Sequence, residues 1–453
     1  MKTPLYNEFL KYIGNNVSRF HMPGHKGQDI YNLGNLWLYD ITEVKNFDNL
    51  LYSNGVIKQV EDKYSEIYNS YASVISTQGS TLGVQMMVTA AYMIQNGQSN
   101  KIIIDRNAHA SAVNTIAVLG FEPVWVYPDE CNNNYMPGVI SANCLEEVIL
   151  CNQDAEIVYI TSPNYFGEMA DLKSISDICK KHNKLLLVDN AHGAHLKFIE
   201  GDLHPMDCNC DCCCDSLHKS LPVLTGGGMV HTLNPEISKY LKRAARIYSS
   251  TSPSYLTMLS IDCLCSYIEG GLKSDLQMLI EKIDEIKKLI CDLGFDLPSG
   301  KLDPIKISIG PGKFNCTAGQ IAEKLREFNV EPEYVGSYWV LLMTSPQNIS
   351  EDFVNLKDAL IDMSKTFHKT VRKSKIDEKA KYLKTQQILP IKEAIFKKFK
   401  TIKTVKSLNK ISAQIIVTVP PCVPIVMPGE IVSREAIDLL LFHKIYFIDV
   451  VDD

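Results

Sequence analysis

The stretch CCCDSLHKSLPVLTGGG, residues 212–228, decides the fold. Its three consecutive cysteines pack as small hydrophobic residues, and with the preceding Asp211 they predict a buried strand over Asp211–Cys214. Lys219 follows the strand within a few residues, and the glycines before the apolar run Gly228–Thr232 mark the turn into another strand. The stretch therefore predicts a strand end that carries a lysine, at the edge where open α/β sheets bind their ligands.

Short apolar runs alternate with helical patterns on the N-terminal side of this stretch. The remaining candidate strands in the first half are Ala72–Ser76, Lys101–Asp105, Glu156–Thr161 and Lys184–Val188. A helix is expected over Ala142–Cys151, and another where Leu172, Ile175, Ile178 and Cys179 recur at helical spacing. The alternation predicts an α/β fold with a mostly parallel sheet and helices on both faces.

The pattern changes after about Ser254. Helices are expected over Leu256–Ile268 and Leu276–Leu293, and a lysine-rich helix over 365–403. The expected strands of this half are Lys306–Ile309, Val340–Thr344 and Ile411–Val419. We therefore predict an N-terminal arm over 1–30, a large domain over 31–255, and a smaller C-terminal α/β domain with linker helices over 256–453.

Composition narrows the class of protein. The chain has 453 residues and a formal net charge of -6, which argues against nucleic acid as its main partner because phosphate binding needs a basic surface. No segment approaches the roughly 20 apolar residues of a membrane helix, and no export signal is recognised at the N-terminus. A cytoplasmic location and the absence of a membrane partner are therefore the expectation.

Polar side chains follow five of the predicted strands. Gly79, Ser80 and Thr81 open a helix, where free backbone N–H groups and the helix dipole favour an anion such as phosphate. The other strand ends supply an imidazole, a carboxylate and a lysine. They carry His109, Ser162–Tyr165, Asp189 with Ala191 and His192, and Ser216, His218 and Lys219. We expect them at one edge of the sheet.

This set of groups suits pyridoxal 5'-phosphate (PLP) chemistry. A partly desolvated lysine forms a Schiff base with the cofactor, and a carboxylate keeps the pyridine nitrogen protonated so that the ring accepts electrons. At about 4 Å and an effective dielectric near 20, such a carboxylate–pyridinium pair is worth about 4 kcal/mol before desolvation. The sequence therefore predicts a PLP enzyme with Lys219 as the Schiff-base lysine.

Over nearly its full length the chain resembles the bacterial ornithine/lysine/arginine decarboxylases of PLP fold type I, in the short form without an N-terminal wing domain. The most specific matching strings are Arg19–Gly27 (RFHMPGHKG) and Ser216–Thr225 (SLHKSLPVLT). Further matches are Arg106-Asn107 with His109 and Ser111, Thr161-Ser162-Pro163, Ala191–His195, Ser252–Tyr255, Pro420-Pro421 and Pro428-Gly429-Glu430.

The resemblance implies a role for each matching residue. Lys219, His218, Asp189 and His109 would be catalytic, with His109 stacked on the cofactor ring and Asp189 on its nitrogen. Ser216, His218 and the Gly79–Thr81 turn would hold the phosphate, Ala191 would pack under the ring, and His192 would lie close by. The resemblance also implies a homodimer or higher oligomer, Ser252 reaching the neighbouring subunit's phosphate, and Glu430 near the substrate's cationic end. No metal is implied.

Several positions depart from the family pattern: Asn190 where Glu is common, Gly226 where Gln is usual, and Val419 and Cys422 within the Tyr-Pro-Pro-Gly string. They bear on the substrate rather than on the cofactor. The resemblance favours decarboxylation of arginine to agmatine, a polyamine precursor, with lysine and ornithine also open.

Three other interpretations stay open. The chain could be another fold type I enzyme, an aminotransferase or a lyase, which would use the same Lys219 and Asp189. It could be a non-catalytic regulatory homologue that pairs with an active enzyme. The cysteines over 208–214 could bind a metal, but their spacing fits structural zinc sites poorly.

Overall fold

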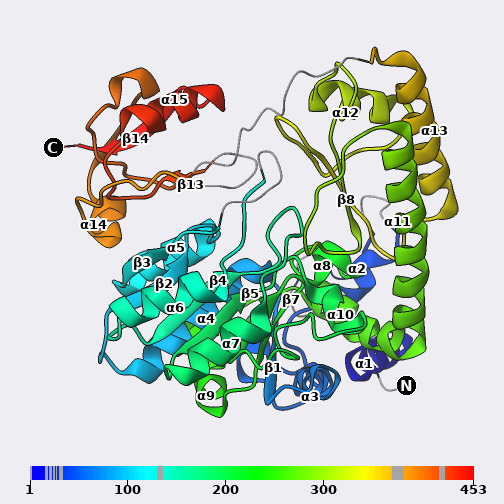
Figure 1. The fold of residues 1–453 in the computed structure, drawn as a ribbon. Coiled ribbons are helices and arrows are strands. Elements are labelled where there is room, and N and C mark those ends of the chain that lie inside the picture. Colours follow the sequence, from blue (N-terminus) through cyan, green and yellow to red (C-terminus); the bar gives the residue numbers. More distant parts are fainter. Residues whose placement is uncertain are drawn as a thin grey trace. The chain divides into compact units, whose positions relative to one another are not determined.

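The computed structural model describes residues 3–15, 19, 23, 26, 28–29, 34–129, 136–369, 382–417 and 424–452. The chain forms two compact units, each built from two segments (Figure 1). The first unit combines Met1–Gln98 with Leu185–Gln277, and the second combines Ser99–Lys184 with Met278–Asp453. The division into an arm, a large domain and a small domain stays a prediction.

The first unit contains four neighbouring strands in the order β1-β7-β6-β5. They are β1 (Ala72–Ser76), β7 (Gly228–Thr232), β6 (Cys212–Asp215) and β5 (Leu185–Asp189). Strands β5 and β6 run parallel, whereas β7 is antiparallel to both of its neighbours. All four residues of β6 are buried, so the predicted cysteine strand is confirmed, one residue further along the chain.

The helices of the first unit are amphipathic except where they are enclosed. Helix α4 (Gly79–Gln95) is apolar around most of its surface because it packs against β6 and β7 and also against α9 (Pro235–Tyr248). At Gly83 a Cβ atom would lie 2.2 Å from the Sγ atom of Cys214, so only glycine permits this approach of helix and strand. The other helices are α1 (Pro4–Gly14), α2 (Leu36–Tyr39), α3 (Val56–Tyr68), α8 (Leu217–Ser220) and α10 (Tyr255–Tyr267), with short turns η1 (Leu50–Tyr52), η2 (Ala194–Phe198) and η3 (Ile268–Leu272).

The second unit begins with three parallel strands in the order β4-β2-β3. They are β2 (Lys101–Asp105), β3 (Glu122–Val126) and β4 (Ile157–Thr161), and the helices of this segment are α5 (Ala110–Leu119), α6 (Ala142–Cys151) and α7 (Leu172–Lys181). The sequence did not predict β3. This strand lies at the end of the strand order, where Pro123 is tolerated and most of its side chains are only half-buried.

A three-stranded antiparallel sheet forms the middle of the second unit. Its strands, in the order β8-β10-β9, are β8 (Lys306–Ile309), β10 (Val340–Met343) and β9 (Tyr334–Val335). Helix α12 (Ala318–Glu327) packs on β10 and on α13 (Ser350–Thr366). Helix α11 (Lys273–Leu293) starts in the first unit and begins after a break at Gly271, as the sequence predicted.

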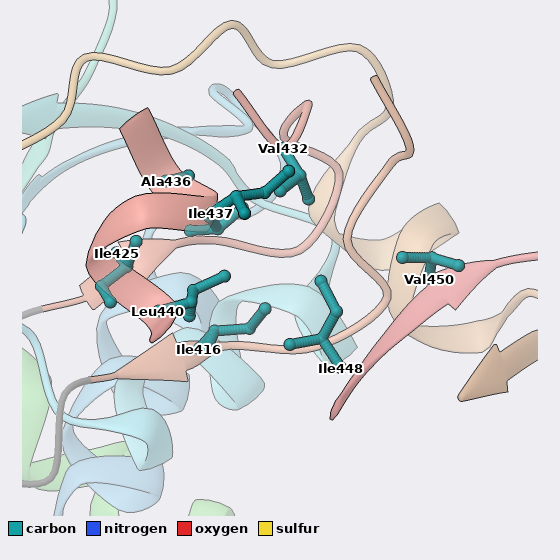
Figure 2. Packing of buried hydrophobic residues seen from close by; sticks show 9 residues of the cluster. Ile416, Ile425, Val432, Ala436, Ile437, Leu440, Ile448 and Val450 are labelled. Carbon is teal, nitrogen blue, oxygen red and sulfur yellow. The ribbon is translucent and has the colours of Figure 1, made fainter. Parts of the chain in front are cut away.

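The last part of the chain has its own small core. Figure 2 shows side chains of α15 (Arg434–Phe442) packing with those of β12 (Ile416–Val417), β13 (Pro424–Val426) and β14 (Phe447–Val451). Two predictions were wrong here. Of the described residues between 367 and 403, only α14 (Ile391–Phe396) is helical, and β11 (Phe399–Lys403) pairs with β14 instead. In the described part of the segment Ile411–Val419, where one long strand was expected, only β12 (Ile416–Val417) is a strand.

None of the helices in the described ranges is both long and apolar enough to span a bilayer.

Candidate active site

Lys219 lies in a short helix directly after β6. Its Nζ atom is 3.1 Å from Nε2 of His192, which follows β5, and both side chains are half-buried. An imidazole at this distance can accept a proton from the lysine amine or return one to it. The structure therefore brings together two of the predicted residues in an arrangement suited to a reactive amine.

The predicted anion-binding turn meets the lysine turn. The backbone N–H of Ser80, in the first turn of α4, donates to Oγ of Ser216 over 3.3 Å. The Nδ1 atom of His218 donates to the carbonyl oxygen of Gly227 over 2.9 Å. In the neutral ring the proton is therefore on Nδ1, and Nε2 is the accepting nitrogen. A Cβ atom at Gly228 would lie 2.9 Å from the Asp215 carbonyl oxygen and 3.1 Å from the backbone of Gly79, so the turns are in close contact.

The remaining predicted cofactor residues of the first unit lie as follows. Asp189 ends β5 and is buried, and one of its oxygens accepts the N–H of Ala191 over 3.1 Å. Ala191 is buried as well, whereas Thr81 is exposed at the start of α4. Ser252 is exposed, and its N–H donates to Oγ of Ser250 over 3.1 Å, so its predicted contact with a neighbouring subunit stays a prediction.

A buried polar cluster that the sequence analysis missed lies behind these turns. Asp215 accepts from Nδ2 of Asn190 over 2.6 Å and pairs with Nε2 of His204 over 3.0 Å. Burial opposes ionisation of Asp215, but the adjoining His204 and His231 hold its pKa below its ordinary value. The signal in the sequence was an aspartate at the end of a wholly apolar strand, since a buried carboxylate needs partners. His204, Cys213 and Asp215 also offer possible metal-ligand atoms within 4.8 Å of one another.

In the second unit, Arg106 follows β2 and is fully buried. Its two terminal nitrogens donate to the two carboxylate oxygens of Glu430 over 2.6 and 2.8 Å. The guanidinium carbon lies 5.0 Å from the ring centre of Trp125 and 5.7 Å from that of Tyr127. A planar guanidinium suits both the bidentate contact and the ring faces.

Glu430 takes part in a buried ion pair that the sequence did not predict. Both of its oxygens bind Arg106, and one also accepts the N–H of Met427 over 2.8 Å. A second bond connects the same regions, since the Tyr382 hydroxyl donates to Asn107 over 2.8 Å. Glu430 closes a buried ion pair between the C-terminal region and the end of β2, and its predicted contact with a substrate is left untested.

His109, predicted to stack on the cofactor ring, caps the start of α5. Its Nδ1 atom accepts the N–H of Ser111 over 3.2 Å and lies 2.9 Å from the Ser111 hydroxyl. An accepting Nδ1 places the ring proton on Nε2 in the neutral form. The ring is exposed, with its orientation fixed from one side by Ser111.

A cavity of about 390 Å³ lies elsewhere in the second unit, lined by residues of 129–143 and 168–174 among those described. None of the predicted site residues lines it.

Comparison with known proteins assigns the family. The family model "Orn/Lys/Arg decarboxylase, major domain" matches residues 3–295. The chain belongs to this family. The arginine decarboxylase of Bacillus subtilis is 26% identical over 468 residues, covering 97% of the chain and 93% of that protein. An uncharacterized Bacillus subtilis protein, YaaO, is 27% identical and covers 97% and 94% of the two chains.

Solved structures of lysine decarboxylases show the same fold. The lysine decarboxylase LdcF of Francisella novicida superposes with a TM-score of 0.82 at 19% identity, covering 99% of this chain and 81% of that chain. The constitutive lysine decarboxylase of Escherichia coli also gives 0.82, at 18% identity and with 100% and 82% covered. The predicted α/β fold, fold type I of the PLP enzymes, is confirmed.

Proposed function

We propose that the chain is a PLP-dependent decarboxylase of a basic amino acid, that Lys219 binds the cofactor, and that arginine is the substrate. The observation that carries the proposal is the meeting of three features in the first unit. Lys219 lies beside His192, its turn contacts the N-terminus of α4, and Asp189 ends the neighbouring strand β5.

The residues present fit PLP. The start of α4 and the hydroxyl of Ser216 provide donors that a phosphate requires, and His218, whose Nδ1 already donates to Gly227, adds a donor at Nε2 when both ring nitrogens carry a proton. Close packing at Gly79 and Gly228 leaves no side chain that would fill the turn. When bound, PLP supplies an electron sink for the pair released as the carboxylate leaves the substrate.

The protein's own residues have separate tasks. Lys219 would hold the cofactor through its Nζ atom, and His192, whose Nε2 atom is 3.1 Å away, would exchange a proton with that nitrogen. Asp189, buried at the end of β5, would keep the ring nitrogen of the cofactor protonated. Ser111 sets the orientation of His109 for the ring face. The pocket selects the bond to be broken by the angle at which it holds the substrate.

The choice of arginine rests on the relatives. Arginine decarboxylases of three Bacillus species, B. subtilis, B. anthracis and B. cereus, are 24–26% identical over at least 94% of the chain. The Escherichia coli lysine decarboxylases are 20% identical, and the match covers only 76% of their length. We propose agmatine as the product, a role in polyamine synthesis, a homodimer as the smallest active form, and a cytoplasmic location.

The test is carbon dioxide release from arginine, lysine and ornithine, measured separately with added PLP, with Lys219→Ala as the control. We expect release from arginine, and loss of both release and the visible absorption of bound cofactor in the variant. Release from lysine or ornithine alone would overturn the substrate. Bound cofactor without release from any of the three would overturn the decarboxylation of basic amino acids.

A further inference from the structure

Asp215 is a fully buried carboxylate that touches both turns of the proposed cofactor site. Its Oδ1 atom accepts from Asn190, the residue after Asp189, over 2.6 Å. Asp215 is followed in the chain by Ser216 and, three residues later, by Lys219. In the main chain, the Asn190 N–H donates to the carbonyl oxygen of Cys214 over 3.0 Å. Side chain and main chain thus join the end of β5 to the end of β6.

The second oxygen of Asp215 is held by His204. Nδ1 of His204 accepts the N–H of Met206 over 3.2 Å, so the ring proton of the neutral form is on Nε2. That proton points to Oδ2 of Asp215 over 3.0 Å. Both oxygens of the carboxylate therefore accept a hydrogen bond from a buried side chain, and the contact with Met206 fixes the direction of the His204 ring.

His231 completes the surroundings. Its Nδ1 atom bonds the Ser73 hydroxyl over 2.8 Å, its Nε2 atom is 3.6 Å from Asp215, and the ring of Tyr68 stacks on it at 3.8 Å. All of these side chains are buried. In such surroundings a carboxylate with fixed partners is rigid, because moving it would leave a buried charge without its hydrogen bonds.

We infer that Asp215 is a positioning residue, which sets the spacing between the turn carrying Asp189 and the turn carrying Lys219 and thereby determines how tightly and in what orientation PLP is held. The inference rests on the proposed function, since it assigns Asp189 and Lys219 to the two ends of one cofactor. Asn190, a departure from the family pattern, is the amide that this carboxylate requires.

The inference takes His204 and Asp215 as hydrogen-bonded to each other rather than as two ligands of a metal ion. The His204–Asp215 contact at 3.0 Å has the length of a hydrogen bond with a proton between the two atoms. Metal in the purified protein is therefore a direct check on the inference.

The experiment compares Asp215→Asn with Asp211→Asn. Asparagine at 215 offers one accepting oxygen, although Asn190 and His204 both require an acceptor. Asp211 is a matched control at the other end of the same strand, where its oxygens accept the Leu186 N–H over 2.9 Å and the Asn234 amide over 3.3 Å. PLP affinity and the induced visible circular dichroism of saturated enzyme are measured, with far-ultraviolet circular dichroism to confirm folding.

Asp215→Asn is expected to raise the Kd for PLP about tenfold and to weaken the induced signal per bound cofactor, whereas Asp211→Asn changes the Kd about twofold or less. Equal effects of the two variants would overturn the inference, because the role would then be general stability. A stoichiometric metal ion in the unaltered enzyme that is lost in Asp215→Asn would also overturn the inference. If Asp215→Asn does not fold, Asn190→Ala is measured instead, because it removes one hydrogen-bond donor and keeps the charge of Asp215. This variant must then raise the Kd for PLP and weaken the induced signal, each by a smaller amount. Absence of PLP binding in the unaltered enzyme would instead overturn the proposed function.

Discussion

Two buried carboxylates, one in each unit, are stabilised in opposite ways. Asp215 is 0% exposed and is bound by an amide and an imidazole, while Glu430 is 1% exposed and is bound by a guanidinium. The side chains that bind Asp215 lie 11 and 25 residues away from it in the sequence, whereas the arginine that binds Glu430 lies 324 residues away. The first fixes local turn geometry, and the second ties the C-terminal region to the end of β2.

The difference shows in what a substitution costs. When one partner of a buried ion pair is lost, the other is left as an unpaired charge, whereas a carboxylate bound by an amide and an imidazole can lose one hydrogen bond and keep the other. Substitutions in the second unit at Glu430 should therefore affect stability most, and those around Asp215 should affect cofactor binding.

Glu430→Gln is expected to give the largest loss of stability, about 3–5 kcal/mol, because Arg106 keeps its charge without a counter-ion. Urea unfolding followed by tryptophan fluorescence measures it, since Trp125 lies against Arg106. The double variant Arg106→Met with Glu430→Met should recover most of the loss. A Glu430→Gln protein as stable as the original would mean that the pair contributes little.

Asp262 gives a pH-dependent effect in the first unit. Its carboxylate accepts the Tyr6 N–H at the start of α1 over 2.9 Å, and burial raises its pKa from 3.8 to about 6. The folded state therefore binds the proton more tightly than the unfolded state, and stability falls as pH rises from 3.8 to about 6. The loss is at most about 3 kcal/mol and is complete above that window.

In Asp262→Asn this loss should be absent, so the stability of the variant relative to the original protein rises between pH 4 and 7. Thermal midpoints across that range measure it. Asp62→Asn, at a carboxylate whose side chain is 56% exposed, should give a flat difference. A flat difference for Asp262→Asn would show that Asp262 ionises normally in the folded protein.

Gly83→Ala tests the close contact behind the cofactor turn. The added methyl group would lie 2.2 Å from the Cys214 sulfur, and we expect a loss of about 2 kcal/mol after the gain in helix propensity. Gly270→Ala is the control, because a Cβ there meets no atom within 4 Å. Chemical denaturation measures the free energy of unfolding of both variants. A Gly83→Ala protein more stable than the original would show that α4 and β6 move apart easily.

The smallest effect is expected at a helix start in the second unit. Thr317 accepts the Gln320 N–H over 3.2 Å, and Gln320 accepts the Thr317 N–H over 2.9 Å. Thr317→Ala should cost about 1 kcal/mol, whereas Thr317→Ser should retain most of the cap. Equal unfolding midpoints for the two variants would contradict this.

The sequence predicted the first half of the fold well because its strands are short apolar runs with clear breaks. Ala72–Ser76, Lys101–Asp105 and Gly228–Thr232 match the structure residue for residue. It missed β3, where a proline interrupts the pattern. It assigned a helix to Phe399–Lys403 because the partner strand β14 is more than 40 residues away and leaves no local signal.

The candidate site divides in the same way. Residues in strand-end motifs, such as Lys219 and Ser216, were found because a turn between strand and helix limits which side chains can follow it. The partners of Arg106 and Asp215 were not found, since hydrogen bonds between distant segments have no periodicity. A buried charge in an apolar run is the one local signal that could have indicated them.

The pairing of β1 with β7 also sets an order of events during synthesis. Ala72 pairs with Thr232, so β1 leaves the ribosome well before the strand that covers its edge. At about 5–20 residues per second the delay is on the order of ten seconds. During that time a mostly apolar strand has an open edge, which is the kind of surface that nascent chains use to associate with one another. Helix α3, made earlier and packed on β1, is the shield available in that interval.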